Sequence, residues 1–460
     1  MANNLLLITI DSLRADHIGS YRYEQPVTPT LDRLENEGTD FTNAVATASH
    51  TKDAFPGMFS SVFPSMQGKH HVDRSYEPLA VALSKCGYET VGYHSTPMMT
   101  SYDYAAGFDE FEDLAESSST SRTVRKITEW IPSALLDPLH RVIKRYGTTG
   151  GIDSVASRAP AAEITDAASE YLGRHDEPFF LFAHYMDAHT PYWPPRMYID
   201  RYANEISDGR VRSLNNKLLE NKDSIHGDPD SLSDQDIEQI RELYDASIRY
   251  IDDCIGRLLE TLSHQDLLDD TLIVVTADHG EEFRDHGGFF HGQKLYDELL
   301  RVPLIYRGPS IPQETSGAQI SHLGLMPTIV DHLGHEVPET ATGTSYTPLF
   351  SDNGEGDEFV LAEATIKRLG RDVGRVIACR HTSGLKLIHN EEIPEWGTEK
   401  WELYDLTEDP SERSNIYDPD HDRIISQMRN RIVDLKDGTI TQDEADEEVE
   451  DRLKDLGYTD

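Results

Sequence analysis

The most constraining feature of this sequence is a buried-strand pattern that ends in metal-ligand residues. The run 271–277 has the continuous apolar, β-branched character of a strand covered on both faces. Asp278 and His279 follow it directly, and the apolar run 5–10 ends in the same way at Asp11. Ligands in open α/β sheets bind at the carboxyl ends of the strands. Two such strands therefore predict an α/β sheet with a metal site along one edge, although an acid after a strand can also be an ordinary turn or cap residue.

Strand and helix patterns alternate along most of the chain, which predicts a doubly wound, mostly parallel sheet flanked by helices. We expect this α/β domain to span residues 1–350, with polar insertions at about 114–157 and 199–232. From about residue 355 the pattern changes to short strands separated by turns. We expect residues 351–460 to form a smaller C-terminal α+β subdomain built on an antiparallel sheet.

The charge of the chain excludes some functions. It has 83 acidic and 42 basic residues, which gives a formal net charge of −41. Such a surface repels nucleic acids and anionic membranes, so we expect no nucleic-acid partner. The acids are spread along the whole chain and lysine is sparse, a pattern typical of proteins that stay soluble in very high salt. We interpret the sequence as halophilic.

Targeting and redox features are sparse. The three cysteines are widely separated, so neither a disulfide framework nor a zinc knot is predicted. The first strand pattern begins directly after Asn4 without a basic stretch, and no apolar run reaches membrane-spanning length. From this we expect a cytoplasmic location and no membrane insertion.

A hydroxyl group next to the metal would complete a reactive site. Ser49 and Thr51 lie in a polar turn that leads into a helix pattern. The N-terminus of a helix favours an anionic group, because free N–H groups and the dipole point toward it. A Ser or Thr in this place is also the usual N-cap, so the position alone does not distinguish the two roles.

Two histidine-rich segments accompany these residues. His184, Asp187 and His189 follow the apolar run 178–183, and His286 and His291 lie among glycines shortly after His279. Scattered polar loop residues would be the plain alternative. Together the groups suit a metal-assisted displacement at an anionic ester, in which a hydroxyl attacks and a histidine protonates the leaving oxygen. Carboxylates with one imidazole permit Ca, Mn, Mg or Zn without selecting among them.

The sequence resembles the sulfatase family of the alkaline phosphatase superfamily, and the resemblance runs nearly from end to end in order. The segments that carry it are 5–17, 28–44, 179–192, 250–253, 278–281, 291–304, 402–410 and 453–458. It implies an alkaline phosphatase-like metallohydrolase domain, a smaller C-terminal sheet and one divalent metal ion beside the nucleophile. The implied substrate is a small-molecule or glycan ester of sulfate or phosphate.

Matched by position, the family roles fall on residues already singled out. Asp11, Asp278 and His279 fall on metal ligands. Thr51 falls on the nucleophile, which also adjoins the metal. His189 and His291 fall near the histidines that contact the transferred group and the leaving oxygen.

The departures from the family pattern concern the residues that bind the sulfate group. Sulfatases carry a Cys or Ser, converted to formylglycine, within a C/S-x-P-x-R pattern. Here Thr51 comes first, Asp53 replaces the proline and Phe55 replaces the arginine. Ser12 stands where a second Asp is usual, and the lysine expected within 92–95 is missing. Threonine cannot become formylglycine by that route.

Three functional interpretations follow from the resemblance and the departures. The leading one is a metal-dependent, sulfatase-like hydrolase that uses a hydroxyl nucleophile, with Ser49 as the alternative to Thr51. The second is a Thr-dependent phosphodiesterase or phosphotransferase of the same superfamily. The third, of another class, is a non-catalytic relative that binds anionic glycans or metal, which the presence of all three expected ligands argues against.

Overall fold

A computed structural model of the chain shows how the predicted elements are arranged. It describes residues 2–19, 23, 25–66, 75–117, 158–174, 178–204, 206–220, 232–351, 354–368, 371–392, 399–418 and 423–437. Most of the predicted insertion 114–157, and the end of the C-terminal subdomain, lie outside these residues.

The described strands build a large, mostly parallel sheet. Its order is β12-β2-β11-β7-β1-β6-β4-β5. The central strand β1 (Asn4–Ile10) pairs in parallel with β6 (Phe179–Tyr185) on one side and β7 (Thr271–Ala277) on the other. The remaining strands are β4 (Glu89–His94), β5 (Glu110–Asp113), β11 (Leu304–Arg307), β2 (Thr39–Phe41) and β12 (Glu314–Ser316). The carboxyl ends of β7, β1, β6 and β4 therefore meet at one edge.

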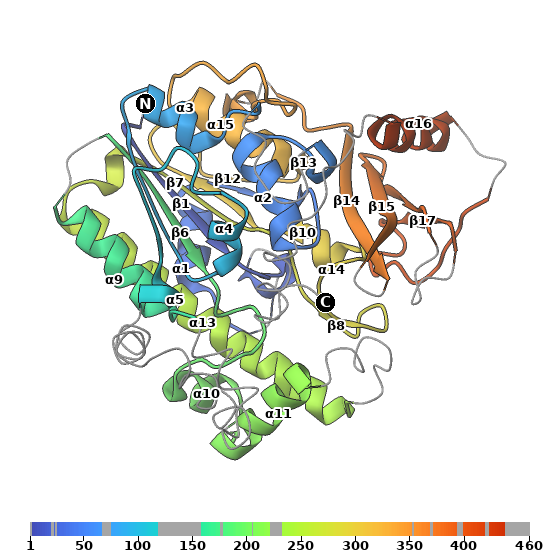
Figure 1. Ribbon diagram of the computed structural model, residues 1–460, viewed down its shortest axis with the longest axis horizontal. Coiled ribbons are helices and arrows are strands. Elements are labelled where there is room, and N and C mark those ends of the chain that lie inside the picture. Colours follow the sequence, from blue (N-terminus) through green and yellow to red (C-terminus); the bar gives the residue numbers. More distant parts are fainter. Residues whose placement is uncertain are drawn as a thin grey trace, which may run out of the picture.

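Helices cover both faces of this sheet, which confirms the doubly wound α/β prediction (Figure 1). The long helix α13 (Asp234–His264) packs against α9 (Ala161–Leu172) on one face. On the other face lie α2 (Thr51–Ser60), α3 (Leu79–Lys85) and α15 (Leu325–His332). α1 (Pro29–Glu37) begins at a proline, as its sequence predicts.

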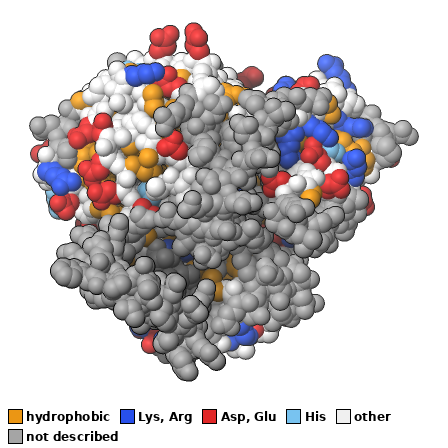
Figure 2. Space-filling model, in the orientation of Figure 1, with side chains coloured by type: hydrophobic (Ala, Val, Ile, Leu, Met, Phe, Trp, Pro, Cys, Tyr) orange, Lys and Arg blue, Asp and Glu red, His pale blue; other side chains and the backbone are white. Residues whose placement is uncertain are grey.

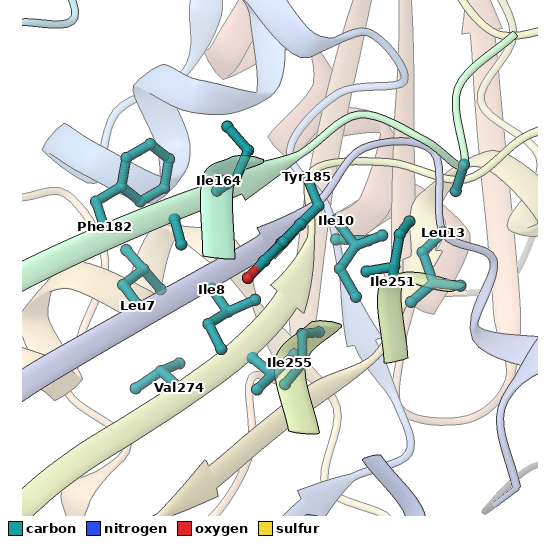
Figure 3. Close-up of a cluster of buried hydrophobic side chains, with 14 of the residues drawn as sticks. Leu7, Ile8, Ile10, Leu13, Ile164, Phe182, Tyr185, Ile251, Ile255 and Val274 are labelled. Atoms are coloured by element: carbon teal, nitrogen blue, oxygen red, sulfur yellow. The ribbon is translucent and has the colours of Figure 1, made fainter. Parts of the chain in front are cut away.

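The core lies between the central strands and these helices. Every residue of β1, β6 and β7 is buried, because a strand in a parallel sheet is covered on both faces. Figure 3 shows apolar side chains of the three strands meeting side chains of α9 and α13; those labelled are Leu7, Ile8, Ile10, Leu13, Ile164, Phe182, Tyr185, Ile251, Ile255 and Val274. This packing fixes where the strand ends lie.

Two segments show details that the sequence pattern does not give. The polar stretch 199–232 contains the end of α10 (Arg196–Tyr202) and the whole of α11 (Asp208–Glu220). The apolar run 302–306 is divided at Pro303. Its first part, β10 (Arg301–Val302), pairs with β3 (Ala44–Val45), and its second part is β11 in the main sheet.

The C-terminal part forms a separate antiparallel sheet, seen at the right of Figure 1. Its order is β14-β15-β16-β17, and α16 (Arg423–Asp437) packs on β15 and β16. The four strands are Phe359–Arg368, Arg371–His381, Leu385–Asn390 and Trp401–Asp405. Apolar residues of this sheet share a small core with Leu295 and Leu300, which flank α14 (Asp297–Leu300). The antiparallel C-terminal sheet is as predicted, while the boundary at residue 350 stays a prediction.

The surface is strongly acidic, in line with the composition. Carboxylate side chains are spread over the described part of the face in Figure 2 rather than gathered in one patch. Among the described residues, no helix combines the length and the apolar character that a membrane crossing requires.

Candidate active site

The structure brings the two predicted strand-end carboxylates together. Asp11, Asp278 and His279 each offer a ligand atom, and these atoms lie within 4.8 Å of one another. All three side chains are fully buried. The distance follows from β1 and β7 being adjacent parallel strands in register, with Ile10 opposite Ala277.

Ser12 links the two carboxylates, at the position where a second Asp was expected. Its hydroxyl donates to Asp11 Oδ1 at 2.7 Å, and its backbone N–H donates to Asp278 Oδ1 at 3.2 Å. Ser12 has φ 61°, in the left-handed region that residues other than glycine rarely adopt. Such backbone strain is concentrated at functional sites. The serine thus holds both ligands in place without adding a third charge.

Gly280 explains why the Asp-His pair is followed by glycine. A Cβ atom at this position would collide with the backbone carbonyl of Glu298. The backbone N–H of Gly280 donates to Leu299 O at 2.8 Å, and His279 Nδ1 lies 2.8 Å from Gly280 O. The close approach of α14 therefore directs His279 Nε2 toward the carboxylates, with Asp278 Oδ2 at 3.4 Å.

Thr51 lies beside this cluster, at the first turn of α2. Its hydroxyl is 3.3 Å from Asp11 Oδ2 and 3.2 Å from His279 Nε2. The helix cap is His50, whose side chain accepts from the backbone of Lys52, so Thr51 is not the capping residue. Ser49, the alternative nucleophile, donates its hydroxyl to the Gly292 carbonyl instead. The geometry favours Thr51 over Ser49.

His291 reaches the site from the loop after β9 (Phe289–Phe290). Its ring lies 4.4 Å from that of His279 and 4.8 Å from that of His189. Its Nδ1 lies 3.1 Å from Glu281 Oε1, and Glu281 also accepts from the Tyr192 hydroxyl at 3.0 Å. The contact of Nδ1 with a buried carboxylate fixes the orientation of the His291 ring. The sequence did not single out Glu281 and Tyr192 for this role, because the contact joins segments far apart in the chain.

His189 is held from behind by Arg158, a residue that the sequence analysis did not identify. Arg158 donates to His189 O at 3.2 Å, and another of its nitrogens lies 3.0 Å from His189 Nδ1. Burial, followed by the Arg158 charge, lowers the pKa of His189 well below its usual value. His189 is therefore neutral in this arrangement, and Nδ1 is also within 2.6 Å of the Thr190 carbonyl.

The other histidines and acids of the two segments have different positions. His184 contacts the cluster from β6, with Nε2 3.5 Å from Asp11 Oδ2 and Nδ1 2.7 Å from Thr9 Oγ1. Asp187 accepts from the first backbone N–H of α9. His286 lies away from the cluster, 2.6 Å from Glu298 and 3.1 Å from the Glu412 carbonyl. For Asp187 and His286 the structure indicates a supporting role.

The residues present fit a divalent cation. Asp278 Oδ1 accepts backbone N–H groups of Ser12 and His279, while Oδ2 is buried with no hydrogen-bond partner among the described residues. Burial, followed by the negative charge of Asp11, raises the pKa of Asp278. Two buried carboxylates, one with an unused oxygen, need a positive charge between them. Asp11, Asp278 and His279, with the Thr51 hydroxyl adjoining, would hold it.

A doubly wound sheet with this cluster at its carboxyl edge defines a class of metal-dependent hydrolases. The sequence model of the family described as "Sulfatase" matches residues 3–335, and one described as "N-sulphoglucosamine sulphohydrolase, C-terminal" matches residues 285–438. The first match covers well over half of the chain. The chain belongs to the sulfatase family and is a sulfatase-like hydrolase.

Individual relatives cover most of the chain at modest identity. An uncharacterised sulfatase of Escherichia coli is 25% identical over 463 residues, covering 94% of this chain and 87% of that protein. A multifunctional alkaline phosphatase superfamily protein of Trinickia caryophylli is 28% identical, covering 77% of this chain and 78% of that protein. Each of these matches covers more than three quarters of both proteins.

Solved structures show the same fold. A phosphonate monoester hydrolase of Agrobacterium radiobacter superimposes with a TM-score of 0.71 at 21% identity, covering 95% of this chain and 96% of its own. A protein solved in complex with its substrate D-glucosamine-2-N,6-O-disulfate has a TM-score of 0.69 at 19% identity, covering 99% and 98%. At these identities the likeness shows the architecture alone.

Proposed function

We propose that this protein hydrolyses a sulfate ester with Thr51 as the nucleophile and one divalent metal ion at Asp11, Asp278 and His279. The observation that carries the proposal is the position of the Thr51 hydroxyl, within 3.3 Å of both Asp11 Oδ2 and His279 Nε2. A threonine whose only role was to cap α2 would have no reason to face this cluster, because His50 already caps the helix.

The residues divide the reaction between them. Thr51 loses its hydroxyl proton to solvent, and its Oγ1 forms a bond to sulfur while the bond from sulfur to the alcohol oxygen breaks. A metal ion at the three ligands would lower the pKa of the hydroxyl and stabilise negative charge. His291, oriented by Glu281, gives a proton to the leaving oxygen, and neutral His189 contacts the transferred group. Water then attacks the threonine sulfate ester, which releases hydrogen sulfate and restores the hydroxyl.

The test is turnover of an aryl sulfate by Thr51→Ala and Thr51→Ser in molar salt with Ca, Mn, Mg or Zn. We expect Thr51→Ala to lose activity by about 1,000-fold or more and Thr51→Ser to retain a measurable rate. Rapid quenching should trap wild-type protein heavier by one SO₃ group, located on Thr51 by peptide mass spectrometry. Ser49→Ala serves as the control. Unchanged turnover in Thr51→Ala would remove this residue from the mechanism.

A Thr-dependent phosphodiesterase or phosphotransferase is the second candidate. Phe55 in place of the motif arginine favours it, as does the similarity to a phosphonate monoester hydrolase. A bis-aryl phosphate in the same assay distinguishes it from the sulfatase. One structural relative has D-glucosamine-2-N,6-O-disulfate as its substrate, so a sulfated sugar is a natural substrate to try.

Two further properties belong with this proposal. The net charge of −41 supports a halophilic protein that works in concentrated salt. The cytoplasmic location expected from the sequence stays a prediction, as does the identity of the metal.

A further inference from the structure

Three consecutive buried residues after β4 carry polar atoms without a hydrogen-bond partner among the described residues. They are His94 Nε2, Ser95 Oγ and Thr96 Oγ1. All three residues are fully buried. Leaving a buried donor unsatisfied is unfavourable, so three in succession need an explanation such as a ligand that they bind.

These residues lie at the same sheet edge as the metal ligands. β4 pairs in parallel with β6, and the last paired residues are Tyr93 and Ala183. The next residue on each strand is a histidine, so that His94 lies beside His184. His184 in turn contacts Asp11. The chain then returns to α2, where the Tyr104 hydroxyl donates to the carbonyl of Lys52 at 2.7 Å. The segment 94–104 therefore runs from the end of β6 to the first turn of the helix that carries Thr51.

The buried atoms without a hydrogen-bond partner differ in whether they can donate a hydrogen bond. His94 Nδ1 accepts from the Thr96 backbone N–H at 3.4 Å, so its proton lies on Nε2. That atom and the two hydroxyls can all donate. On the ligand side, His184 Nε2 and Asp278 Oδ2 also lack a hydrogen-bond partner among the described residues, and of these Asp278 Oδ2 only accepts when ionised. Donors on one side and an acceptor on the other suit an oxyanion and a cation, respectively.

The donors carry no charge. The family lysine was expected within 92–95, and its place is taken by the histidine and serine; Phe55 replaces the motif arginine. Burial, followed by the nearby His184, lowers the pKa of His94 to about 3. Arg158 lies behind His189, and Lys52 follows Thr51 in the sequence. Two positions that are positively charged in the family pattern are thus occupied by uncharged residues.

We infer that His94, Ser95 and Thr96 form an uncharged oxyanion subsite that selects singly charged esters over doubly charged ones. Sulfate monoesters and phosphodiesters carry one negative charge, whereas a phosphate monoester above its second pKa, about 6, carries two. Neutral donors stabilise one charge through hydrogen bonds but do not offset a second charge in a buried site. This inference rests on the proposed function and specifies its substrate class.

The experiment compares p-nitrophenyl sulfate, bis-p-nitrophenyl phosphate and p-nitrophenyl phosphate at about pH 8, where the last carries two charges. We expect kcat/KM for at least one singly charged ester to exceed that for p-nitrophenyl phosphate by about 100-fold. Equal or faster turnover of p-nitrophenyl phosphate would overturn the inference and leave the proposed hydrolase intact. No turnover of any of the three with any of the four metals would contradict the proposed function itself.

Variants give a second, independent readout. Ser95→Ala and Thr96→Ala should each lower kcat/KM for the preferred ester by about 10-fold, because a bond to a charged group is lost. The melting temperature should stay unchanged or rise, because the substitution removes an unsatisfied polar atom. Ser95→Lys should shift the preference toward p-nitrophenyl phosphate by about 10-fold or more.

A matched control separates the subsite from ordinary packing. Ser247, on α13, is also fully buried with a hydroxyl that has no hydrogen-bond partner among the described residues. We expect Ser247→Ala to leave all three kcat/KM values unchanged. Unchanged kinetics in both Ser95→Ala and Thr96→Ala, or a melting temperature that falls together with activity, would overturn the assignment.

Discussion

At the scale of single residues, the site depends on a few groups that oppose one another electrostatically. Asp11 and Asp278 are buried side by side, and burial with the neighbouring charge raises the pKa of Asp278. Such an arrangement is unfavourable without a cation and favourable with one. Stability and metal binding are therefore coupled through this pair.

Asp278→Asn should remove most of the stabilisation that metal binding provides. In the presence of a chelator we expect the variant to be more stable than wild type by about 1 kcal/mol or more, because a buried charge is removed. With saturating Mn²⁺, wild type should gain roughly 3 kcal/mol at about 100 times the dissociation constant, and the variant much less. Urea unfolding with and without metal measures both. Asp269→Asn, an exposed carboxylate, is the control, and an equal metal-induced gain in Asp278→Asn would exclude it as a ligand.

At the scale of secondary-structure elements, α2 has to position Thr51 while packing into the core. Phe55, one turn after the proposed nucleophile Thr51, is fully buried against the rings of Phe59, Tyr104 and His184 at 5.1–5.5 Å. An aromatic cluster thus occupies the place where the family motif has a charged side chain. The substitution changes packing as well as charge.

Restoring the motif arginine should therefore damage the protein. We expect Phe55→Arg to lower the free energy of unfolding by about 3 kcal/mol or more, because the guanidinium would be buried without a partner. Phe55→Leu, which keeps an apolar side chain, should cost about 1–2 kcal/mol. Denaturant unfolding compares the two. A Phe55→Arg protein as stable as Phe55→Leu would show that the site already contains a negative group facing this position.

The elements show where sequence reasoning succeeds and fails. The strands 5–10 and 271–277 were predictable because continuous burial leaves an apolar run, and adjacent strand ends follow from a parallel sheet. The division of the apolar run 302–306 at Pro303 was not predictable, because it depends on which strands pair with the residues before and after the proline. The Glu281–His291 and Arg158–His189 contacts were hidden for the same reason. They join residues whose spacing in the sequence carries no pattern.

At the scale of the whole molecule, charge dominates the balance of stability. The protein has a net charge of −41, and its carboxylates are distributed over the surface (Figure 2). At low ionic strength these carboxylates repel one another. Salt bridges on such a surface contribute little individually, so screening by the solvent matters more than local pairs. The fold should tolerate, and require, concentrated salt.

Raising KCl from about 0.1 M to about 3 M should increase the melting temperature by about 10 °C or more, because the screening length falls from about 10 Å to under 3 Å. Circular dichroism melts measure the shift. Sucrose, which is excluded from protein surfaces without screening charge, is the control and should give a smaller increase. A melting temperature that is independent of KCl would contradict the halophilic interpretation.

The contact between the C-terminal sheet and the segment that carries His291 has a consequence for biosynthesis. Leu295 and Leu300 share a core with strands of that sheet, and the backbone N–H of Asp297 donates to a side-chain oxygen of Glu412. While the ribosome is still making the first 350 residues, the main sheet can assemble with its ligand cluster, but the segment that follows His291 lacks these contacts. We therefore expect the site to reach its final geometry only after residues 359–412 have been synthesised.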